Sequence, residues 1–192
     1  MRIKGISNIK YFAQGARGII YTGTYLNKKV AIKTKNPESK AIERIKNEIK
    51  FLEILNKKNI GPKLLLKNDN YFVYEFQEGT YFDHWIKNKD KKQFKKTVIK
   101  LLKQCFIMDK LMIDKKEMLR PYRNVIIKKY NVPILIDFER CNYTKKPKNV
   151  TQLVQFMMNK KLVDKKVIKL LKDYKINVSD EKFNLILKYL VD

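Results

Sequence analysis

The hydrophobic pattern of the chain changes near residues 77–79, and this change constrains the fold more than any other feature. Before it, Gly18–Tyr25 is rich in the β-branched and aromatic residues typical of strands. After it, apolar residues over Phe94–Leu111 recur every three or four positions, the spacing of an amphipathic helix. We therefore expect an α+β protein with a strand-rich part over residues 1–78 and a helix-rich part over residues 79–192.

Turn residues and apolar periodicity place the other elements within these two parts. The expected elements, in chain order, are strands at Gly18–Tyr25 and Val30–Thr34, a helix capped by Ser39 and running to Asn56, strands at Lys63–Leu66 and Tyr71–Phe76, a helix at Phe94–Leu111, a hairpin at Asn124–Asp137, and helices at Asn149–Asn159, Asp164–Tyr174 and Ser179–Leu190.

The composition indicates a folded, basic protein. Of 192 residues, 44% are hydrophobic, which excludes a largely disordered chain, and 44 Lys and Arg against 19 Asp and Glu give a net charge of +25. No apolar run approaches the ~20 residues that span a bilayer, so we expect a cytoplasmic protein without a membrane partner. The charge fits an RNA or ribonucleoprotein partner, or simply lysines solvated on every face. The two cysteines lack metal-site spacing and are expected to be reduced and structural.

A glycine-rich stretch precedes a lysine inside an apolar strand. Gly15 and Gly18 would let the backbone approach phosphate groups, and Lys33, at the end of Val-Ala-Ile-Lys, requires an anionic partner. Glu48 lies at the edge of the apolar stripe of the expected helix, where an unpaired carboxylate is costly. We predict an ion pair between Lys33 and Glu48; the alternative is a solvated Glu48 at the rim of the stripe.

Two further segments carry candidate ligand groups. If Val125–Ile127 pairs antiparallel with Ile134–Ile136, Asn124 and Asp137 fall side by side, and their oxygens suit Mg²⁺. The alternative is an ordinary turn asparagine and a strand-ending aspartate. Near the boundary between the two parts, the backbone around Glu75 and Gln77 is placed to hydrogen-bond a flat heteroaromatic ring.

The order of these elements resembles the protein-kinase-like fold over about residues 8–160. The resemblance is closest to small atypical kinases of archaeal type, such as the RIO kinases and the kinase of the KEOPS complex. It implies a two-lobed α+β fold, with a β-rich lobe carrying one helix over residues 1–78 and a reduced helical lobe over residues 79–192. It implies ATP and Mg²⁺ as ligands. The implied site comprises Gly15 and Gly18 over the triphosphate, Lys33 on the α- and β-phosphates paired with Glu48, Glu75 and Gln77 in the cofactor site, and Asn124 and Asp137 on the metal.

The chain departs from the kinase pattern in its catalytic loop. Leu119 stands where the pattern has the base aspartate, and the nearest carboxylate, Glu117, is the candidate base. Glu139 replaces the glycine that often follows Asp137-Phe138, and no Ala-Pro-Glu motif follows as a peptide platform. The expected function is phosphoryl transfer to a Ser or Thr hydroxyl of a protein. The alternatives are a nucleotide-binding pseudokinase that holds RNA or a protein complex, and a small-molecule kinase.

Overall fold

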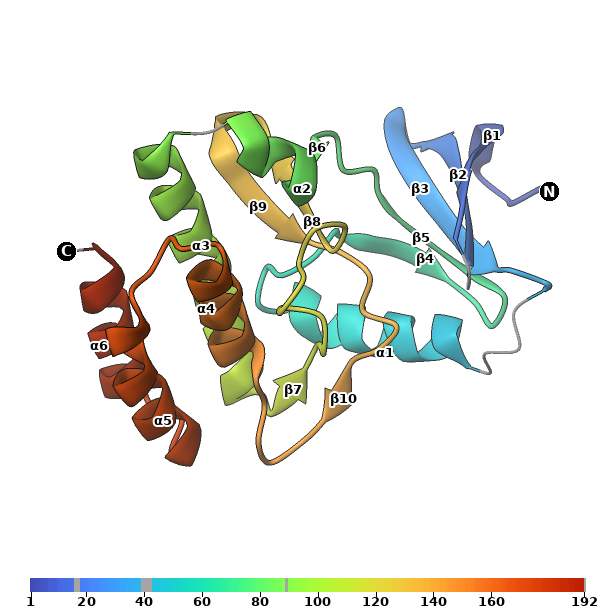
Figure 1. Ribbon diagram of the computed structural model, residues 1–192. Helices are drawn as coiled ribbons and strands as arrows, with labels where there is room; N and C mark the ends of the chain where they lie inside the picture. The colour runs from blue at the N-terminus through green and yellow to red at the C-terminus, as the bar shows by residue number, and fades with distance from the viewer. Residues whose placement is uncertain (16–17, 39–42, 89, 192) are drawn as a thin grey trace. The chain divides into compact units, whose positions relative to one another are not determined.

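The computed structural model describes residues 1–15, 18–38, 43–88 and 90–191. The chain divides into two compact units: residues 1–78 with Ile136–Arg140 form the first, and residues 79–135 with residues 141–192 form the second. Over the described residues the protein is α+β, with a five-stranded antiparallel sheet and six α-helices (Figure 1).

The first unit is built on the five-stranded sheet, whose spatial order is β1-β2-β3-β5-β4. Its elements are β1 (Ile6–Gln14), β2 (Gly18–Tyr25), β3 (Lys28–Lys35), α1 (Arg44–Asn56), β4 (Leu64–Lys67) and β5 (Tyr71–Glu75). The helix α1 packs against β3, β4 and β5. The predicted strands of this part are therefore confirmed with small shifts of their ends, and β1 is an additional strand.

Burial and turn geometry explain why β3 occupies the centre of this sheet. Val30 and Ile32 are fully buried and pack with Ile3 and Val73 in one apolar cluster. A two-residue turn joins β2 to β3, because Tyr25 pairs with Lys28 and the two residues between them have positive φ. Strand alternation then directs the side chains of β3 to opposite faces of the sheet.

The helix α1 presents an apolar stripe to the core of the first unit. Its buried residues include Ile45, Ile49, Leu52 and Leu55, at the spacing that the sequence predicts. The described helix begins at Arg44, after Glu43 in a left-handed conformation and without a side-chain cap. The predicted cap Ser39 and the first apolar position Ile42 lie outside the described residues.

Over its described residues, the second unit contains five α-helices and two small sheets. Its elements are β6 (Thr80–Tyr81), α2 (Phe82–Trp85), α3 (Lys91–Lys110), β7 (Ile113–Asp114), β8 (Val125–Lys128), β9 (Val132–Leu135), β10 (Asn142–Tyr143), α4 (Asn149–Asn159), α5 (Ile168–Ile176) and α6 (Asp180–Val191). One sheet has the order β6-β8-β9, and the other pairs β10 with β7. The helix α3 packs against α4 and α6 (Figure 1).

Most predicted helices of this part are present, with one correction. The helix α4 has the predicted bounds, and the Ser179 hydroxyl accepts the Lys182 backbone N–H at 3.3 Å, as expected of a cap. The expected helix from Asp164 instead begins as a 3₁₀ turn over Lys165–Val167, and the α-helix starts only at Ile168. Asp164 caps that short turn by accepting the Lys166 backbone N–H.

A buried carboxylate joins three helices of the second unit. Asp109, near the end of α3, is 2% exposed. Its two oxygens accept the backbone and side-chain N–H groups of Asn149, the backbone N–H of Val150 and the hydroxyl of Tyr174. Burial raises the pKa of Asp109 to about 6, although these hydrogen bonds oppose the rise.

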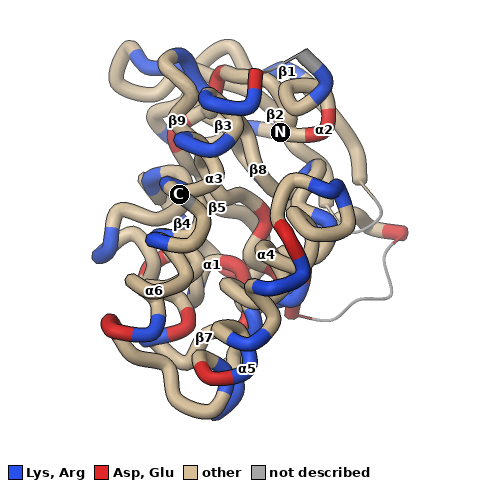
Figure 2. Tube along the Cα trace, turned by 60° about the vertical axis from the view of Figure 1, so that its left-hand side comes forward, with Lys and Arg blue, Asp and Glu red and all other residues tan. Residues whose placement is uncertain are grey.

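The surface charge is spread widely. Lys and Arg recur on helices, strands and loops of both units and are not gathered in one segment (Figure 2). Among the described residues, no helix combines the length and the apolar character needed to cross a membrane. Both cysteines are buried, as expected of structural cysteines.

Candidate functional site

Lys33 lies in β3 with its side chain directed into the first unit. It is 8% exposed, and its Nζ donates to Glu48 Oε2 on α1 at 2.6 Å. The ion pair predicted between these two residues is therefore present. Strand alternation turns Lys33 inward, and the helical spacing places Glu48 beside the apolar stripe of α1, so each charge offsets the desolvation of the other.

Two more carboxylates face the same ammonium. Lys33 Nζ lies 3.3 Å from Asp137 Oδ1 and 3.7 Å from Glu139 Oε2. All four residues belong to the first unit, since Ile136–Arg140 is part of it. Three carboxylates therefore lie around one ammonium, and Lys33 contacts each of them.

Backbone contacts fix the segment that carries Asp137 and Glu139. Glu48 Oε1 accepts the Phe138 backbone N–H at 3.2 Å, so Glu48 binds Lys33 with one oxygen and this segment with the other. Asn47 Nδ2 and Arg44 Nη1 donate to the Glu139 carbonyl at 2.9 and 3.2 Å. The helix α1 therefore positions both the lysine and the acidic segment.

Phe138 anchors the same segment in the core of the first unit. Its ring is 1% exposed and lies against Gly61, where an added Cβ would sit 2.8 Å from the ring. Gly61 also has a φ of +81°, a conformation that only glycine adopts without strain. Asp137 has a φ of 62°, which costs an L-residue about 1 kcal/mol or more. The contacts of Phe138 hold Asp137 in this uncommon conformation.

The electrostatics follow from burial and from the neighbouring charges. Burial alone would lower the pKa of Lys33, but the carboxylates of Glu48 and Asp137 outweigh it and raise that pKa above its ordinary value. Burial raises the pKa of Glu48; the Lys33 ammonium opposes this effect and the Asp137 carboxylate reinforces it. Lys33 is therefore a permanent cation at neutral pH.

The three carboxylates have the chemistry of a divalent-cation site. One oxygen each from Glu48, Asp137 and Glu139 lies within 4.8 Å of the others. Carboxylate oxygens are hard ligands that suit Mg²⁺, and neighbouring negative charges fit a divalent cation. The three residues therefore fit the Mg²⁺ that the sequence predicts. Glu48 and Glu139 are candidate ligands in addition to the predicted ligand Asp137.

The structure corrects the hairpin geometry from which Asn124 was paired with Asp137. Val125 pairs with Leu135, one residue from the predicted register, and β9 ends there, so the ladder does not place Asp137 opposite Asn124. Asn124 precedes β8 in the second unit, and its backbone N–H donates to the Pro121 carbonyl. A metal-binding role for Asn124 stays a prediction.

The glycine stretch lies close to Lys33. The Gly15 N–H donates to the Gly18 carbonyl at 2.9 Å, and Asn36 Nδ2 donates to the Gly15 carbonyl at 3.2 Å. An added Cβ at Gly18 would sit 3.0 Å from Lys33 Cε and 3.1 Å from the Thr34 carbonyl oxygen. Glycine at position 18 therefore lets the backbone pass close to the lysine stem.

The segment after β5 uses part of its hydrogen-bonding capacity internally. The Glu75 N–H donates to the Lys63 carbonyl, and Gln77 Nε2 donates to the Glu75 carbonyl at 2.7 Å. The Phe76 ring contacts Phe12 edge-on at 5.3 Å and lies 4.0 Å from Lys29 Nζ. Binding of a heteroaromatic ring by the backbone near Glu75 and Gln77 stays a prediction.

Glu117, the candidate base, is fixed by a lysine of the second unit. Its Oε2 accepts from Lys115 Nζ at 3.0 Å, and the Lys115 side chain is fully buried. The Lys115 backbone N–H also donates to Asn149 Oδ1. Leu119, at the position of the expected aspartate, is 42% exposed. The role of Glu117 as a base stays a prediction.

Three residues around these groups were missed by sequence reasoning. Glu139 lies two residues beyond Asp137, and this spacing of two carboxylates is a usable signal. Lys115 has no sequence feature that separates it from the many other lysines. Asn36 gave no signal, because its contact with Gly15 depends on how the loop closes after β3.

The fold and these side chains define an α+β protein in which the buried Lys33 lies among the buried carboxylates of Glu48 and Glu139 and the partly exposed carboxylate of Asp137. No protein-family model matches the sequence, and a search of curated proteins finds no match either.

Proposed function

We propose that the chain is an ATP- and Mg²⁺-dependent phosphotransferase of the kinase-like fold, acting on a hydroxyl group of a Ser or Thr side chain. The observation that carries the proposal is Lys33, buried in an ion pair with Glu48 and faced by Asp137 and Glu139. A polyphosphate bound with a divalent cation fits such a cluster, because the phosphates would pair with the Lys33 ammonium and the cation would pair with the carboxylates.

Each residue then has a defined task. Lys33 would bind α- and β-phosphate oxygens, with Glu48 orienting its ammonium, and the backbone at Gly15 and Gly18 would lie over the phosphates. Asp137 and Glu139 would hold Mg²⁺, which supplies neutralisation of phosphate charge when bound.

The transfer itself forms a bond from the acceptor oxygen to the γ-phosphorus. The bond from that phosphorus to the β–γ bridging oxygen breaks, and ADP leaves. Glu117 is the residue that the kinase-like resemblance assigns as acceptor of the hydroxyl proton. Because phosphoryl transfer has a loose transition state, a base displaced from the usual position lowers the rate without abolishing the reaction.

The first test is thermal stabilisation of the full chain by ATP with and without Mg²⁺. We expect ATP with Mg²⁺ to raise the melting temperature of the wild type, and Asp137→Asn to remove most of the part that depends on Mg²⁺. The control is Lys67→Met, which breaks an exposed ion pair with Glu53 in the same unit and leaves the shift unchanged. Absence of any shift with ATP and Mg²⁺ in the wild type would refute the proposal.

The second candidate is a nucleotide-binding pseudokinase that holds RNA or a ribonucleoprotein. Leu119 at the position of the base and the net charge of +25 favour it. This candidate predicts ATP binding without transfer of the γ-phosphoryl group, and RNA affinity that falls steeply with salt. Transfer of ³²P from ATP to a protein acceptor, abolished by Lys33→Met, would decide against it.

A third candidate is a small-molecule kinase, because the sequence lacks the Ala-Pro-Glu motif of a peptide platform. A screen of hydroxylated metabolites against protein acceptors separates it from the first. For all three we propose a cytoplasmic location, where ATP is available.

A further inference from the structure

A groove of about 360 Å³ in the second unit is lined by α4, by α5 and by the loop that carries Leu119. Its apolar lining residues are Leu119, Met158, Ile168 and Leu171. The volume falls within the range of about 300–1,000 Å³ in which proteins bind ligands. All of these residues belong to the second unit, so the groove is separate from the cluster around Lys33.

Helical spacing makes the groove elongated. The lining residues of α4 extend from Thr151 to Met158, and those of α5 extend from Ile168 to Lys175. Each of these stretches covers two helical turns, or about 10 Å, and its lining residues recur three or four positions apart, as neighbours on one face of a helix do. Such a groove fits a segment of extended or helical chain better than a compact molecule.

Two apolar side chains of the groove remain in contact with water. Leu119 is 42% exposed and Ile168 is 37% exposed, whereas Leu171 is 8% exposed. The loop is fixed with Leu119 at the surface, because its neighbour Met118 is fully buried and donates its backbone N–H to Gln152 Oε1 at 3.2 Å. A ligand that covers Leu119 and Ile168 therefore gains hydrophobic free energy that folding leaves unused.

The charged groups that line the groove have one sign. Lys172 and Lys175 line it from α5, both are exposed, and no carboxylate is among the described lining residues. The two acidic residues nearest to the lining in sequence are engaged elsewhere: Asp173 lines a separate pocket between α5 and α6, and Glu117 pairs with Lys115. An acidic ligand therefore meets two cations in the groove.

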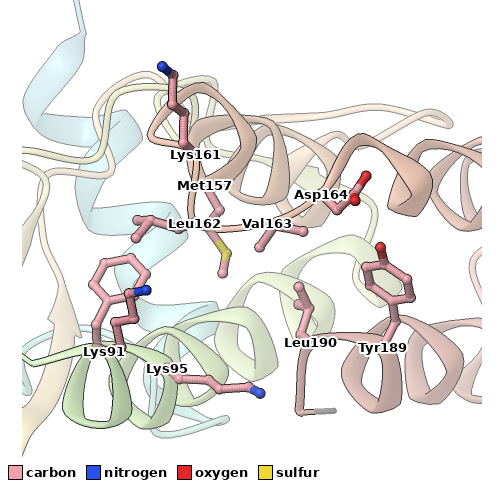
Figure 3. A pocket seen from close by; sticks show the side chains of 10 residues that line it. Lys91, Lys95, Met157, Lys161, Leu162, Val163, Asp164, Tyr189 and Leu190 are labelled. Carbon is pink, nitrogen blue, oxygen red and sulfur yellow. The ribbon is translucent and has the colours of Figure 1, made fainter.

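A larger cavity of the same unit lacks this single sign of charge. It has a volume of about 570 Å³ and lies among the start of α3, the end of α4, the loop that follows α4 and the end of α6 (Figure 3). Lys91, Lys95 and Lys161 share its lining with the carboxylate of Asp164. Its charged groups do not select an acidic over a basic ligand, whereas those of the groove do.

We propose that the groove between α4 and α5 binds a short acidic amphipathic segment of a partner protein. Aliphatic side chains of the segment would cover Leu119 and Ile168, and its carboxylates would pair with Lys172 and Lys175. The net charge of +25 attracts an acidic protein and repels a second copy of this chain. The described lining offers no aromatic ring on which a nucleic-acid base would stack. The proposal does not depend on phosphoryl transfer.

The test is fluorescence anisotropy of the full chain with two short labelled peptides of glutamate and leucine at an ionic strength of about 0.15 M. One peptide has its leucines at helical spacing, and in the other leucine and glutamate alternate. We expect saturable binding of at least one of them. Lysine in place of glutamate, or serine in place of leucine, should weaken that peptide by about tenfold or more, because each change removes one half of the recognition.

A matched pair of lysine variants separates the groove from the general charge of the protein. Lys172→Gln with Lys175→Gln should weaken the peptide by about tenfold, the loss expected for charge-assisted contacts. The control is Lys100→Gln with Lys103→Gln, which removes two exposed lysines at the same spacing from α3, outside the groove. It should change the affinity by less than about twofold.

A second set of variants tests the apolar contacts. Leu119→Gln and Ile168→Gln should each weaken the peptide by about threefold, because each side chain has only part of its surface left to bury. The control is Ile176→Gln, at an 83% exposed position at the end of α5 outside the groove, which should leave the affinity unchanged. Circular dichroism checks that every variant is folded.

Three results would overturn the proposal. The first is absence of saturable binding of both acidic peptides to the wild type, or an equal loss of affinity in the two double lysine variants. The second is an oligouridylate that binds more tightly than both peptides and depends on Lys172 and Lys175, which would assign the groove to RNA. The third is a wild-type dimer, seen by analytical ultracentrifugation, that Ile168→Gln dissociates, which would assign the groove to a second copy.

Discussion

Asp109 makes the stability of the second unit depend on pH in a direction opposite to that of most acidic residues. The carboxyl is 2% exposed, and burial raises its pKa from 3.8 to about 6. The folded state therefore binds this proton more tightly than the unfolded state. The contribution of Asp109 to the free energy of unfolding is therefore greatest below about pH 4, and this contribution is lost as the pH rises through about 6.

The magnitude follows from the two pKa values. They differ by about 2.2, and each tenfold change in proton affinity corresponds to about 1.4 kcal/mol, so the loss is about 3 kcal/mol. Asp109→Asn removes the titrating group but keeps an oxygen acceptor beside Asn149. The free energy of unfolding of the wild type should therefore fall relative to that of the variant by about 3 kcal/mol between pH 3 and pH 7.

The assay is urea unfolding followed by tryptophan fluorescence at several pH values. Trp85 is the single tryptophan of the chain, is buried and belongs to the second unit, so it reports on the unit that contains Asp109. The control is Asp173→Asn, at an exposed position of α5, which should keep the pH dependence of the wild type. A wild-type stability that runs parallel to that of Asp109→Asn across this range would refute the reasoning.

Three predictions concern the first unit, each followed by urea unfolding with far-ultraviolet circular dichroism. Lys33→Met leaves the buried carboxylates of Glu48 and Glu139 without their ammonium and should destabilise the unit by about 3–5 kcal/mol at pH 7, a loss that shrinks when the carboxylates are protonated at acid pH. Gly61→Ala forces a Cβ to within 2.8 Å of the Phe138 ring at a φ of +81° and should cost about 1–3 kcal/mol; an unchanged midpoint would contradict that contact. Glu139→Gln removes one of three neighbouring negative charges, so it should raise the free energy of unfolding of the metal-free protein. It should also reduce the further increase that Mg²⁺ gives, and a larger increase would exclude Glu139 as a ligand.

The ion pair between Lys33 and Glu48 was predictable because both residues lie in strongly periodic segments. A lysine in an apolar strand and a glutamate beside an apolar helical stripe each carry a desolvation cost that one contact removes. The bounds of α4 were predictable for the same reason, since its apolar residues follow a clear helical period.

Other features depend on geometry that a local pattern does not contain. The hairpin register differs by one residue from the predicted one, and a shift of one residue changes which side chains share a face. The strands β6, β7 and β10 have two residues each, too few to show an alternation. The place of Glu139 depends on the left-handed conformation of Asp137 and on the packing of Phe138, neither of which follows from residue spacing.

The charge balance around Lys33 is relevant to the proposed metal–polyphosphate ligand. A single buried ion pair can often be replaced by apolar residues with no loss of stability. Adding Asp137 and Glu139 to the pair of Lys33 and Glu48 brings like charges together. Like charges at close range cost free energy, and a divalent cation bound by the carboxylates would offset that cost. The proposed metal–polyphosphate ligand would therefore stabilise the arrangement that is least favourable for the protein alone.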